Sequence, residues 1–217
     1  MIKAIFLDFS GTMVHEDDPY IMQLMRYFLT SSDLNTPEKV LTTVWGMLKK
    51  LEWDCFQDTF IKKDAMVDRI LADCVQEYHL TADLSAMHTA WRNSWLHTPL
   101  FDDVRPFVEH CPLPVYVVTN NDLSYTEQNL AEKGLSVAGI VSSEMALACK
   151  PHPEILLEAL RIAGVKPEEA VLIGDSEKSD IPCAGAAGIT PVLLDREGRI
   201  DGSRPYRVIH SLTDFNL

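Results

Sequence analysis

The spacing of apolar residues changes near residue 98 of this chain and divides it into two kinds of sequence. Between about residues 15 and 97, apolar side chains recur three or four positions apart, which is typical of one helical face. Four such rows predict helices: Tyr20, Leu24, Tyr27 and Phe28; Leu41, Val44, Leu48 and Leu51; Met66, Ile70, Cys74 and Tyr78; and Leu84, Met87, His88, Trp91 and Trp95. This stretch shows no strand pattern and is closed by Pro99. It therefore predicts a purely helical unit.

After Pro99, short apolar runs bounded by turn residues replace the helical rows. The runs predict strands over residues 115–119, 139–142, 170–173 and 190–194, and a short one over 207–209. Helices are predicted between them, over 123–133, 153–163 and 181–187, and each precedes a glycine suited to end a helix. Alternating strands and helices favour a parallel sheet that is covered by helices on both faces.

One more buried strand is predicted at the start of the chain, where Ala4-Ile5-Phe6-Leu7 runs into Asp8 and a turn at Gly11. The later strands are the only other strands that the sequence predicts, so this first strand must join their parallel sheet. We therefore expect an α/β fold with a doubly wound, Rossmann-like core formed by residues 1–14 and 98–217. Residues 15–97 would form an α-helical domain inserted after the first strand.

The composition limits the compartment and the classes of partner. A net charge of −13 argues against a nucleic-acid or anionic membrane surface. The five cysteines are scattered and odd in number, which favours free thiols in a reducing compartment. Met1 lies directly before the first strand and no apolar run reaches membrane-spanning length, so we expect no signal peptide and a cytoplasmic location.

Polar residues follow several of the predicted strands. Thr119 and Asn120 end one strand just before a helix, whose free N–H groups favour a phosphate. Lys150 lies in a loop stiffened by prolines, and Asp175 and Asp180 follow another buried strand. Because ligands bind at the carboxyl ends of parallel strands, we expect these side chains to meet Asp8 at one edge of the sheet.

In this order, the four stretches resemble the four signatures of the haloacid dehalogenase-like hydrolases, and the helical insertion resembles the cap of that superfamily's largest branch. The resemblance implies that Asp8 is a nucleophile that forms an aspartyl-phosphate. It implies Mg²⁺ held by Asp8, the backbone carbonyl of Ser10 and Asp175, with Asp180 as a secondary ligand or an orienting group for the lysine. Thr119, Asn120 and Lys150 would bind phosphoryl oxygens, and Asp8, Ser10 and Lys150 would be the catalytic residues. The implied function is a Mg²⁺-dependent phosphatase for a small phosphorylated metabolite.

Ser10 departs from the family pattern, because the first signature here is Asp-x-Ser-Gly-Thr where most of these phosphatases have a second aspartate. That aspartate protonates the leaving oxygen and later activates water, which a serine hydroxyl cannot do near neutral pH. Three interpretations stay open. The protein is a phosphatase, slow or aided by a group such as His15. It is a hydrolase whose leaving group needs no acid, for halide or C–P cleavage. Or it is a binding or regulatory module.

Two further features bear on these alternatives. Asp175 and Asp180 argue against halide displacement, because haloacid dehalogenases work without a metal. Lys49 lies 41 residues after Asp8, in a segment that resembles the cap-lysine segment of phosphonoacetaldehyde hydrolases. A competing interpretation is that Lys49, together with Lys50, Lys62 and Lys63, is simply a solvated charge on a helix.

Overall fold

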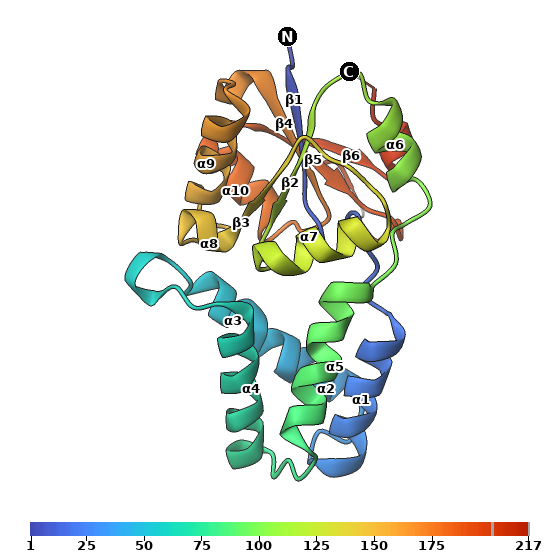
Figure 1. Ribbon diagram of the computed structural model, residues 1–217, viewed down its shortest axis with the longest axis vertical. Coiled ribbons are helices and arrows are strands. Elements are labelled where there is room, and N and C mark those ends of the chain that lie inside the picture. The colour runs from blue at the N-terminus through green and yellow to red at the C-terminus, as the bar shows by residue number, and fades with distance from the viewer. Residues whose placement is uncertain (201, 217) are drawn as a thin grey trace.

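A parallel β-sheet covered by helices forms one end of the molecule, and a bundle of helices forms the other (Figure 1). The computed structural model describes residues 1–200 and 202–216. The strands are β1 (Ala4–Leu7), β2 (Val115–Thr119), β3 (Gly139–Ser142), β4 (Ala170–Gly174), β5 (Thr190–Leu194) and β6 (Arg207–Ile209). They form one six-stranded sheet in the order β3-β2-β1-β4-β5-β6, with every neighbouring pair parallel. The predicted α/β, Rossmann-like fold is confirmed.

The first strand lies in the middle of this sheet, although a long helical stretch separates it from the others in sequence. Ile5 of β1 pairs in register with Val115 of β2 on one side and with Val171 of β4 on the other. Successive strands then lead outward in opposite directions from this centre. Open α/β sheets bind ligands at the carboxyl ends of strands beside such a reversal. Asp8 follows β1 at this point.

Helices cover both faces of the sheet, namely α6 (Val104–His110), α7 (Leu123–Glu132), α8 (Ser143–Ala146), α9 (Glu154–Ala163) and α10 (Asp180–Ala187). Ile5 and Leu7 of β1 pack in one hydrophobic cluster with residues of α6 and α7. Phe6 packs in a second cluster with residues of α9 and α10. This alternation is the period of two that a strand buried on both faces requires.

The remaining helices form what we call the helical region: α1 (Pro19–Ser31), α2 (Pro37–Val40), a π-helical turn (Leu41–Trp45), α3 (Gly46–Trp53), α4 (Lys63–Glu77) and α5 (Leu84–His97). The four predicted rows of apolar residues lie on these helices, the second row spanning the π-helical turn and α3. Short 3₁₀ turns lie at Gln57–Thr59, Pro167–Glu169 and Leu212–Asp214. Among the described residues, no helix is both long enough and apolar enough to cross a membrane.

The helical region has a hydrophobic core of its own. Phe28, Ile70 and Trp91 lie in this cluster, which is distinct from the two clusters that flank the sheet. Two neighbouring stretches of chain join it to the sheet, and the Thr98 hydroxyl donates a hydrogen bond to the backbone carbonyl of His15 across them at 2.6 Å. The helical region therefore has its own core, and it also contacts the sheet part elsewhere, where the Gln57 N–H donates to the Leu147 carbonyl at 2.7 Å and the Cys149 N–H donates to the Cys55 carbonyl at 3.0 Å.

Candidate active site

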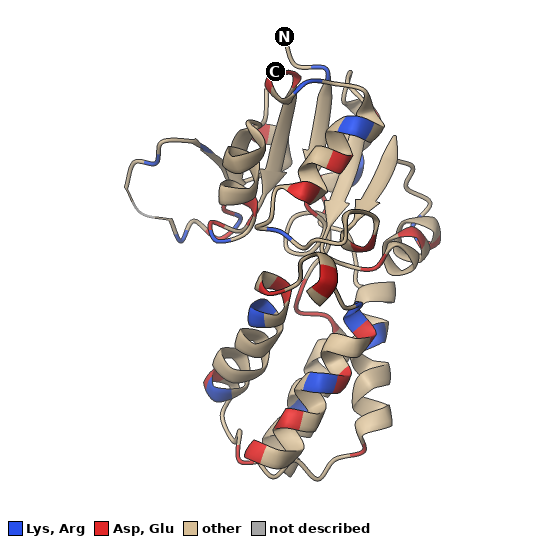
Figure 2. Ribbon diagram, turned by 90° about the vertical axis from the view of Figure 1, so that its left-hand side faces the viewer, with Lys and Arg blue, Asp and Glu red and all other residues tan. Residues whose placement is uncertain are grey.

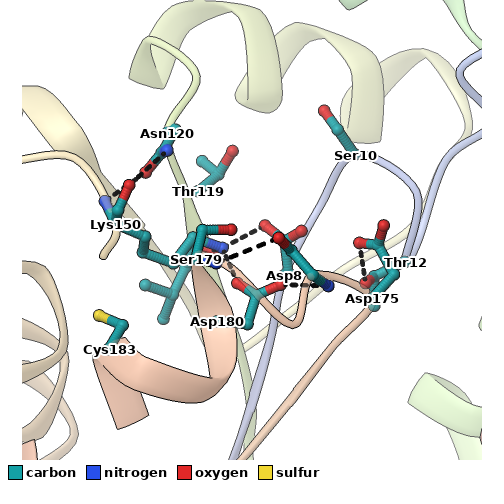
Figure 3. A network of polar contacts seen from close by, with 12 residues as sticks. Asp8, Ser10, Thr12, Thr119, Asn120, Lys150, Asp175, Ser179, Asp180 and Cys183 are labelled. Carbon is teal, nitrogen blue, oxygen red and sulfur yellow. Dashed lines mark hydrogen bonds and ion pairs between the residues drawn. The ribbon is translucent and has the colours of Figure 1, made fainter. Parts of the chain in front are cut away.

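The carboxyl edge of the sheet brings together side chains that lie far apart in the sequence (Figure 3). Asp8 comes directly after β1, and its backbone N–H donates to the carbonyl of Ile173 on β4 at 2.9 Å. Thr119 is the last residue of β2, and Asp175 follows β4 directly. Each of these positions is fixed by the strand before it, so the arrangement does not depend on a flexible loop.

Lys150 lies at the centre of this edge and is almost completely buried, with 3% of its side chain exposed. Its Nζ atom lies 2.5 Å from Asp8 Oδ1 and 2.6 Å from Asp180 Oδ1, and it donates to the carbonyl of Val118 at 3.2 Å. The charges of Asp180 and Asp8 outweigh the opposing effect of burial and raise the pKa of Lys150 above its usual value. The ammonium group therefore stays charged between two carboxylates.

Asn120 holds the loop that carries Lys150. Its side-chain oxygen accepts the Lys150 backbone N–H at 2.7 Å, and its amide nitrogen donates to the Lys150 carbonyl at 3.2 Å. The Asn120 side chain is thus engaged with the backbone of the lysine loop. Thr119 differs, because its hydroxyl oxygen accepts the N–H of Asn121 at 3.0 Å and its proton remains available to a ligand.

Three carboxylates at this edge can hold a cation. One oxygen from each of Asp8, Asp175 and Asp180 lies within 4.8 Å of the others. Asp175 also accepts a hydrogen bond from the Thr12 hydroxyl at 3.1 Å, and Asp180 accepts the Ser176 N–H at 3.0 Å. Carboxylate oxygens are the ligands that hard cations such as Mg²⁺ prefer. The donor set therefore fits a magnesium ion.

The protonation of these acids supports the same fit. Burial raises the pKa of Asp8 to about 8, with Lys150 opposing and the charges of Asp180 and Asp175 adding to the effect. Burial raises the pKa of Asp175 to about 6, and the charges of Asp180 and Glu16 add to it. In the absence of a cation, both acids therefore hold a proton more strongly than usual. A divalent cation beside them would lower both pKa values.

Two glycines allow the acids to approach the backbone. Gly11 has a φ of +77°, and a Cβ atom there would lie 2.5 Å from Asp175 Oδ2. A Cβ atom on Gly174 would lie 2.4 Å from the carboxylate of Asp180. Ser10 lies in the turn that Gly11 makes, where its hydroxyl accepts a hydrogen bond from the Asn121 side chain at 3.4 Å. Any side chain at either glycine would displace a carboxylate of the cluster.

A cleft of about 980 Å³ separates this edge from the helical region. All the residues that the sequence predicts for the site line it except Asp180, which lies behind Lys150: Asp8, Ser10, Thr119, Asn120, Lys150 and Asp175. The helical side contributes charged and aromatic residues, among them Glu16, Lys49, Glu52, Lys63 and Trp95. The cleft therefore has a wall of buried, interlocked groups and a wall of more accessible ones.

The interpretation of Lys63 as a solvated charge is wrong. Only 3% of its side chain is exposed, because it forms an ion pair with Glu52 Oε1 and its ammonium group lies 5.9 Å from the centre of the Trp95 ring. Lys49 does agree with that interpretation in its exposure, since 63% of its side chain is accessible, and its Nζ lies 3.3 Å from Glu52 Oε2. The charges of Lys63 and Lys49 outweigh burial and lower the pKa of Glu52 to about 2.

Sequence reasoning missed several residues of the cleft. Glu16, Glu52 and Asn121 belong to no sequence motif of their own, because each is a single polar residue beside a stronger motif or on a helical face. The signal for Asn121 was its place two residues after Thr119, at the end of a strand. The signal for Glu16 was its position shortly after the Gly11 turn, in the chain that leaves the first strand.

Comparisons with known proteins agree with this architecture. A family model described as haloacid dehalogenase-like hydrolase matches residues 2–188. Glyceraldehyde 3-phosphate phosphatase of Methanopyrus kandleri is 42% identical over 78 residues, 36% of this chain and 32% of that protein. Phosphoglycolate phosphatase 1 of Pseudomonas aeruginosa is 26% identical over 179 residues, 78% of this chain and 65% of that protein. The matched part of the chain thus spans about a third of the length of the first relative and about two thirds of the length of the second.

A solved structure extends the agreement to nearly the whole chain. L-2-haloacid dehalogenase from Xanthobacter autotrophicus, with chloropropionic acid covalently bound, superimposes with a TM-score of 0.76. The match covers 99% of this chain and 96% of that one, at 17% identity. This similarity concerns the fold.

Proposed function

Since this chain belongs to the haloacid dehalogenase-like hydrolases, we propose that it is a Mg²⁺-dependent phosphatase that acts on a small phosphorylated metabolite through Asp8. The observation that carries the proposal is the position of Lys150 Nζ, 2.5 Å from Asp8 and 2.6 Å from Asp180, beside three carboxylates that can hold a cation. This arrangement sets positive charge around one carboxylate that borders an open cleft. The phosphatases among the relatives support the substrate class.

The residues of the sheet edge take distinct parts in the proposed reaction. Asp8 attacks phosphorus with a carboxylate oxygen and forms an aspartyl-phosphate, and water then releases it. Lys150 and the Thr119 hydroxyl hold phosphoryl oxygens and offset the charge that builds in the transition state. Asp8, the carbonyl of Ser10 and Asp175 would hold Mg²⁺. When bound, Mg²⁺ supplies positive charge to the carboxylates and the phosphoryl group, which keeps Asp8 ionised.

Asp180 and Asn120 have supporting parts in this proposal. Asp180 fixes the lysine ammonium group by the contact at 2.6 Å, while Asn120 fixes the backbone of the same residue. We assign Asp180 mainly to the orientation of Lys150, and only secondarily to the binding of the metal. Asn120 would reach the phosphoryl group with its backbone N–H, since its side chain is engaged.

We further propose that residues 15–97 form a cap domain over a core of residues 1–14 and 98–217. The separate hydrophobic core of the helical region supports this division. The cleft between the two layers supports it as well, because a substrate there would contact both. The cap would select the substrate and exclude water, and the paired connections near Thr98 and His15 would act as its hinge.

One specific observation keeps C–P cleavage as a second candidate. Lys49, the residue that resembles a cap lysine of phosphonoacetaldehyde hydrolases, lines the same cleft as Asp8. An imine-forming lysine needs a lowered pKa. Here the charges of Glu52, Glu16 and Asp8 together outweigh burial and raise the pKa of Lys49, with Glu52 the largest contributor. The charged form is a poor nucleophile, so the phosphatase is the better supported function.

A substrate panel with and without Mg²⁺ tests the proposal. It contains alkyl, aryl and acyl phosphates, phosphonoacetaldehyde and a haloacid, and Asp8→Asn serves as the control for each. We expect Mg²⁺-dependent release of phosphate from the phosphate compounds, absent in the control. Cleavage of phosphonoacetaldehyde that Lys49→Ala abolishes would favour the second candidate. Turnover of the haloacid in excess chelator would contradict both, and inertness with retained Mg²⁺ and phosphate binding would indicate a non-catalytic module.

A further inference from the structure

Among the described residues that surround Asp8 at the sheet edge, no carboxyl group is free to exchange a proton with the leaving oxygen. Ser10 stands where the family's general acid is usual, and its hydroxyl is bound to the Asn121 side chain. Asp8, Asp175 and Asp180 are committed to the phosphoryl group, the cation or Lys150. A general acid or base contributes about 10²- to 10⁴-fold to such a reaction. The helical side of the cleft can supply this missing group.

We propose that Glu16 is this group: it protonates the leaving oxygen and then activates the water that releases the phosphoryl group. This inference rests on the proposed function, because it assigns a residue to the same reaction. Glu16 lines the cleft together with Asp8 and Ser10, from the chain segment that leaves β1 toward α1.

The backbone on both sides of Glu16 is held in place. Val14 is 1% exposed and forms bridges with Ser10 and with Leu100. On the other side, Asp18 is 4% exposed and caps α1 by accepting the N–H groups of Tyr20 and Ile21 at 2.7 and 3.0 Å. Glu16 thus extends from a short, anchored segment into a cleft that it shares with the nucleophile. A proton-transfer group needs this kind of fixed placement.

The charges that face Glu16 come from the sheet edge and from two helices. Asp8 and Asp175 are on the sheet side, Glu52 and Lys49 on α3, and Lys63 on α4. Although the side chain is accessible through the cleft, the loss of surrounding water raises the pKa of Glu16 above its usual value. Lys49 opposes this shift, and Asp8 adds to it. A raised pKa brings a carboxyl group closer to the range in which general acids work at neutral pH.

His15, the alternative that the sequence offers, is engaged elsewhere. Its ring stacks on Phe101 with 3.8 Å between centroids, and Nδ1 lies 3.4 Å from Asp17. Phe101 in turn lies under the Arg196 guanidinium at 3.9 Å. These contacts hold His15 in a packed stack at the hinge. Glu16 is the next residue and has the free carboxyl group.

The proposed reaction has two steps, and Glu16 transfers a proton in each. An oxygen of Asp8 bonds to phosphorus, the bond from phosphorus to the leaving oxygen breaks, and that oxygen takes the proton of the Glu16 carboxyl group. Glu16, now a carboxylate, then accepts a proton from water as the water oxygen bonds to phosphorus. The bond from phosphorus to Asp8 breaks, and its electron pair returns to the carboxylate. One phosphate ester and one water become one alcohol and one phosphate, and both side chains are restored.

The test compares Glu16→Gln with Asp17→Asn, a matched loss of charge at the next position. The probes are glycerol phosphate, whose leaving oxygen needs a proton, and p-nitrophenyl phosphate, whose leaving group departs as an anion. With Glu16→Gln we expect turnover of glycerol phosphate to fall about 10²- to 10⁴-fold. With p-nitrophenyl phosphate we expect a first burst equal to the enzyme concentration, followed by slow turnover. Asp17→Asn should behave as the wild type on both probes.

A second variant separates proton transfer from a structural role. Ser10→Asp places a carboxyl group at the usual family position, so it should restore turnover of glycerol phosphate in the Glu16→Gln background by at least about tenfold. Glu16→Gln should also remove one limb of the pH profile of kcat. A structural role for Glu16 would give neither the rescue nor the lost limb.

The outcomes distinguish this inference from the proposed function. If the wild type shows Mg²⁺-dependent turnover and Asp8→Asn none, but Glu16→Gln stays within about threefold of the wild type on glycerol phosphate, the role of Glu16 is overturned alone. Equal losses of burst and steady-state rate, without rescue by Ser10→Asp, overturn it as well. If the wild type itself shows no burst and no turnover on either probe, the proposed function fails and the inference falls with it.

Discussion

The two walls of the cleft differ in how their charged groups are held. On the sheet side, the buried Lys150 ammonium group pairs with Asp8 and Asp180, and a carboxylate oxygen of Asp175 lies within 4.8 Å of these two acids. On the helical side, Lys49 and Glu16 are accessible to the cleft, whereas Glu52 and Lys63 are buried as a pair. Figure 2 shows acidic residues where the two layers meet. A fixed wall suits the transfer of a phosphoryl group, and an accessible wall suits the choice of substrate.

Loss of the nucleophile should have the largest effect of any change in the cleft. Asp8→Asn removes the attacking oxygen, so turnover of every phosphate substrate should fall by about 10⁴-fold or more. The fold should survive, because Lys150 keeps its ion pair with Asp180. Steady-state kinetics with circular dichroism as the control checks this. Activity within tenfold of the wild type would remove Asp8 from the reaction.

Loss of a ligand of the cation should have the next largest effect on activity. Asp175→Asn should abolish Mg²⁺-dependent activity, because it removes one of three carboxylates that lie within 4.8 Å of one another. Wild-type protein at a Mg²⁺ concentration 100 times the Kd should gain about 2.7 kcal/mol of stability, since the ion binds only the folded state. The variant should gain much less. Thermal unfolding with and without Mg²⁺ measures this, and an equal gain in both proteins would contradict the assignment.

The buried pair on the helical side should affect stability more than chemistry. Lys63→Met leaves the Glu52 carboxylate buried beside Lys49 alone, and we expect a loss of about 3 kcal/mol in the free energy of unfolding. The double variant Lys63→Met and Glu52→Leu should recover most of that loss, because both charges are gone. Urea unfolding of the wild type, the single variant and the double variant measures these free energies of unfolding. If the Lys63→Met variant were as stable as the wild type, the ion pair of Lys63 with Glu52 would not be buried in solution.

The pH dependence of stability tests the protonation of the carboxylates on the sheet side. Burial raises the pKa of Asp8 to about 8 and that of Asp175 to about 6 in the metal-free protein. The folded state then binds more protons than the unfolded state between about pH 4 and 8, so stability should fall as pH rises through this window. Saturating Mg²⁺ should flatten the slope. Melting temperatures from pH 5 to 8 check this, and a rising slope without Mg²⁺ would contradict it.

The same two walls differ in what could be predicted from sequence. The strands and the sheet-edge residues were predictable because each short apolar run ends at a polar residue, and parallel strands bring those ends together. Asp8, Thr119 and Asp175 are such ends, and the structure brings them to one edge. The helical wall was not predictable to the same depth. A row of apolar residues identifies the buried face of a helix, but it does not say which polar residue borders a cleft formed by another layer.

Particular residues show where the prediction failed. Lys63 was misjudged because nothing local marks its partner Glu52, which lies on another helix. The short helix α6 went unpredicted because its 7 residues include Pro106 and are too few to show a period. The pairing of the Asn120 side chain with the backbone of Lys150 went unpredicted, since it depends on two loops meeting in space. The failures at Lys63 and Asn120 both concern contacts between distant segments.

The central claim is that the fixed wall carries phosphoryl transfer through Asp8. Wild-type protein with Mg²⁺ is mixed with p-nitrophenyl phosphate, quenched in acid at early times, digested and analysed by mass spectrometry. We predict one phosphoryl group on the peptide that contains Asp8, located on that residue, and absent in Asp8→Asn. A phosphoryl group on any other residue, or turnover without a phosphorylated protein at any time, would contradict the account.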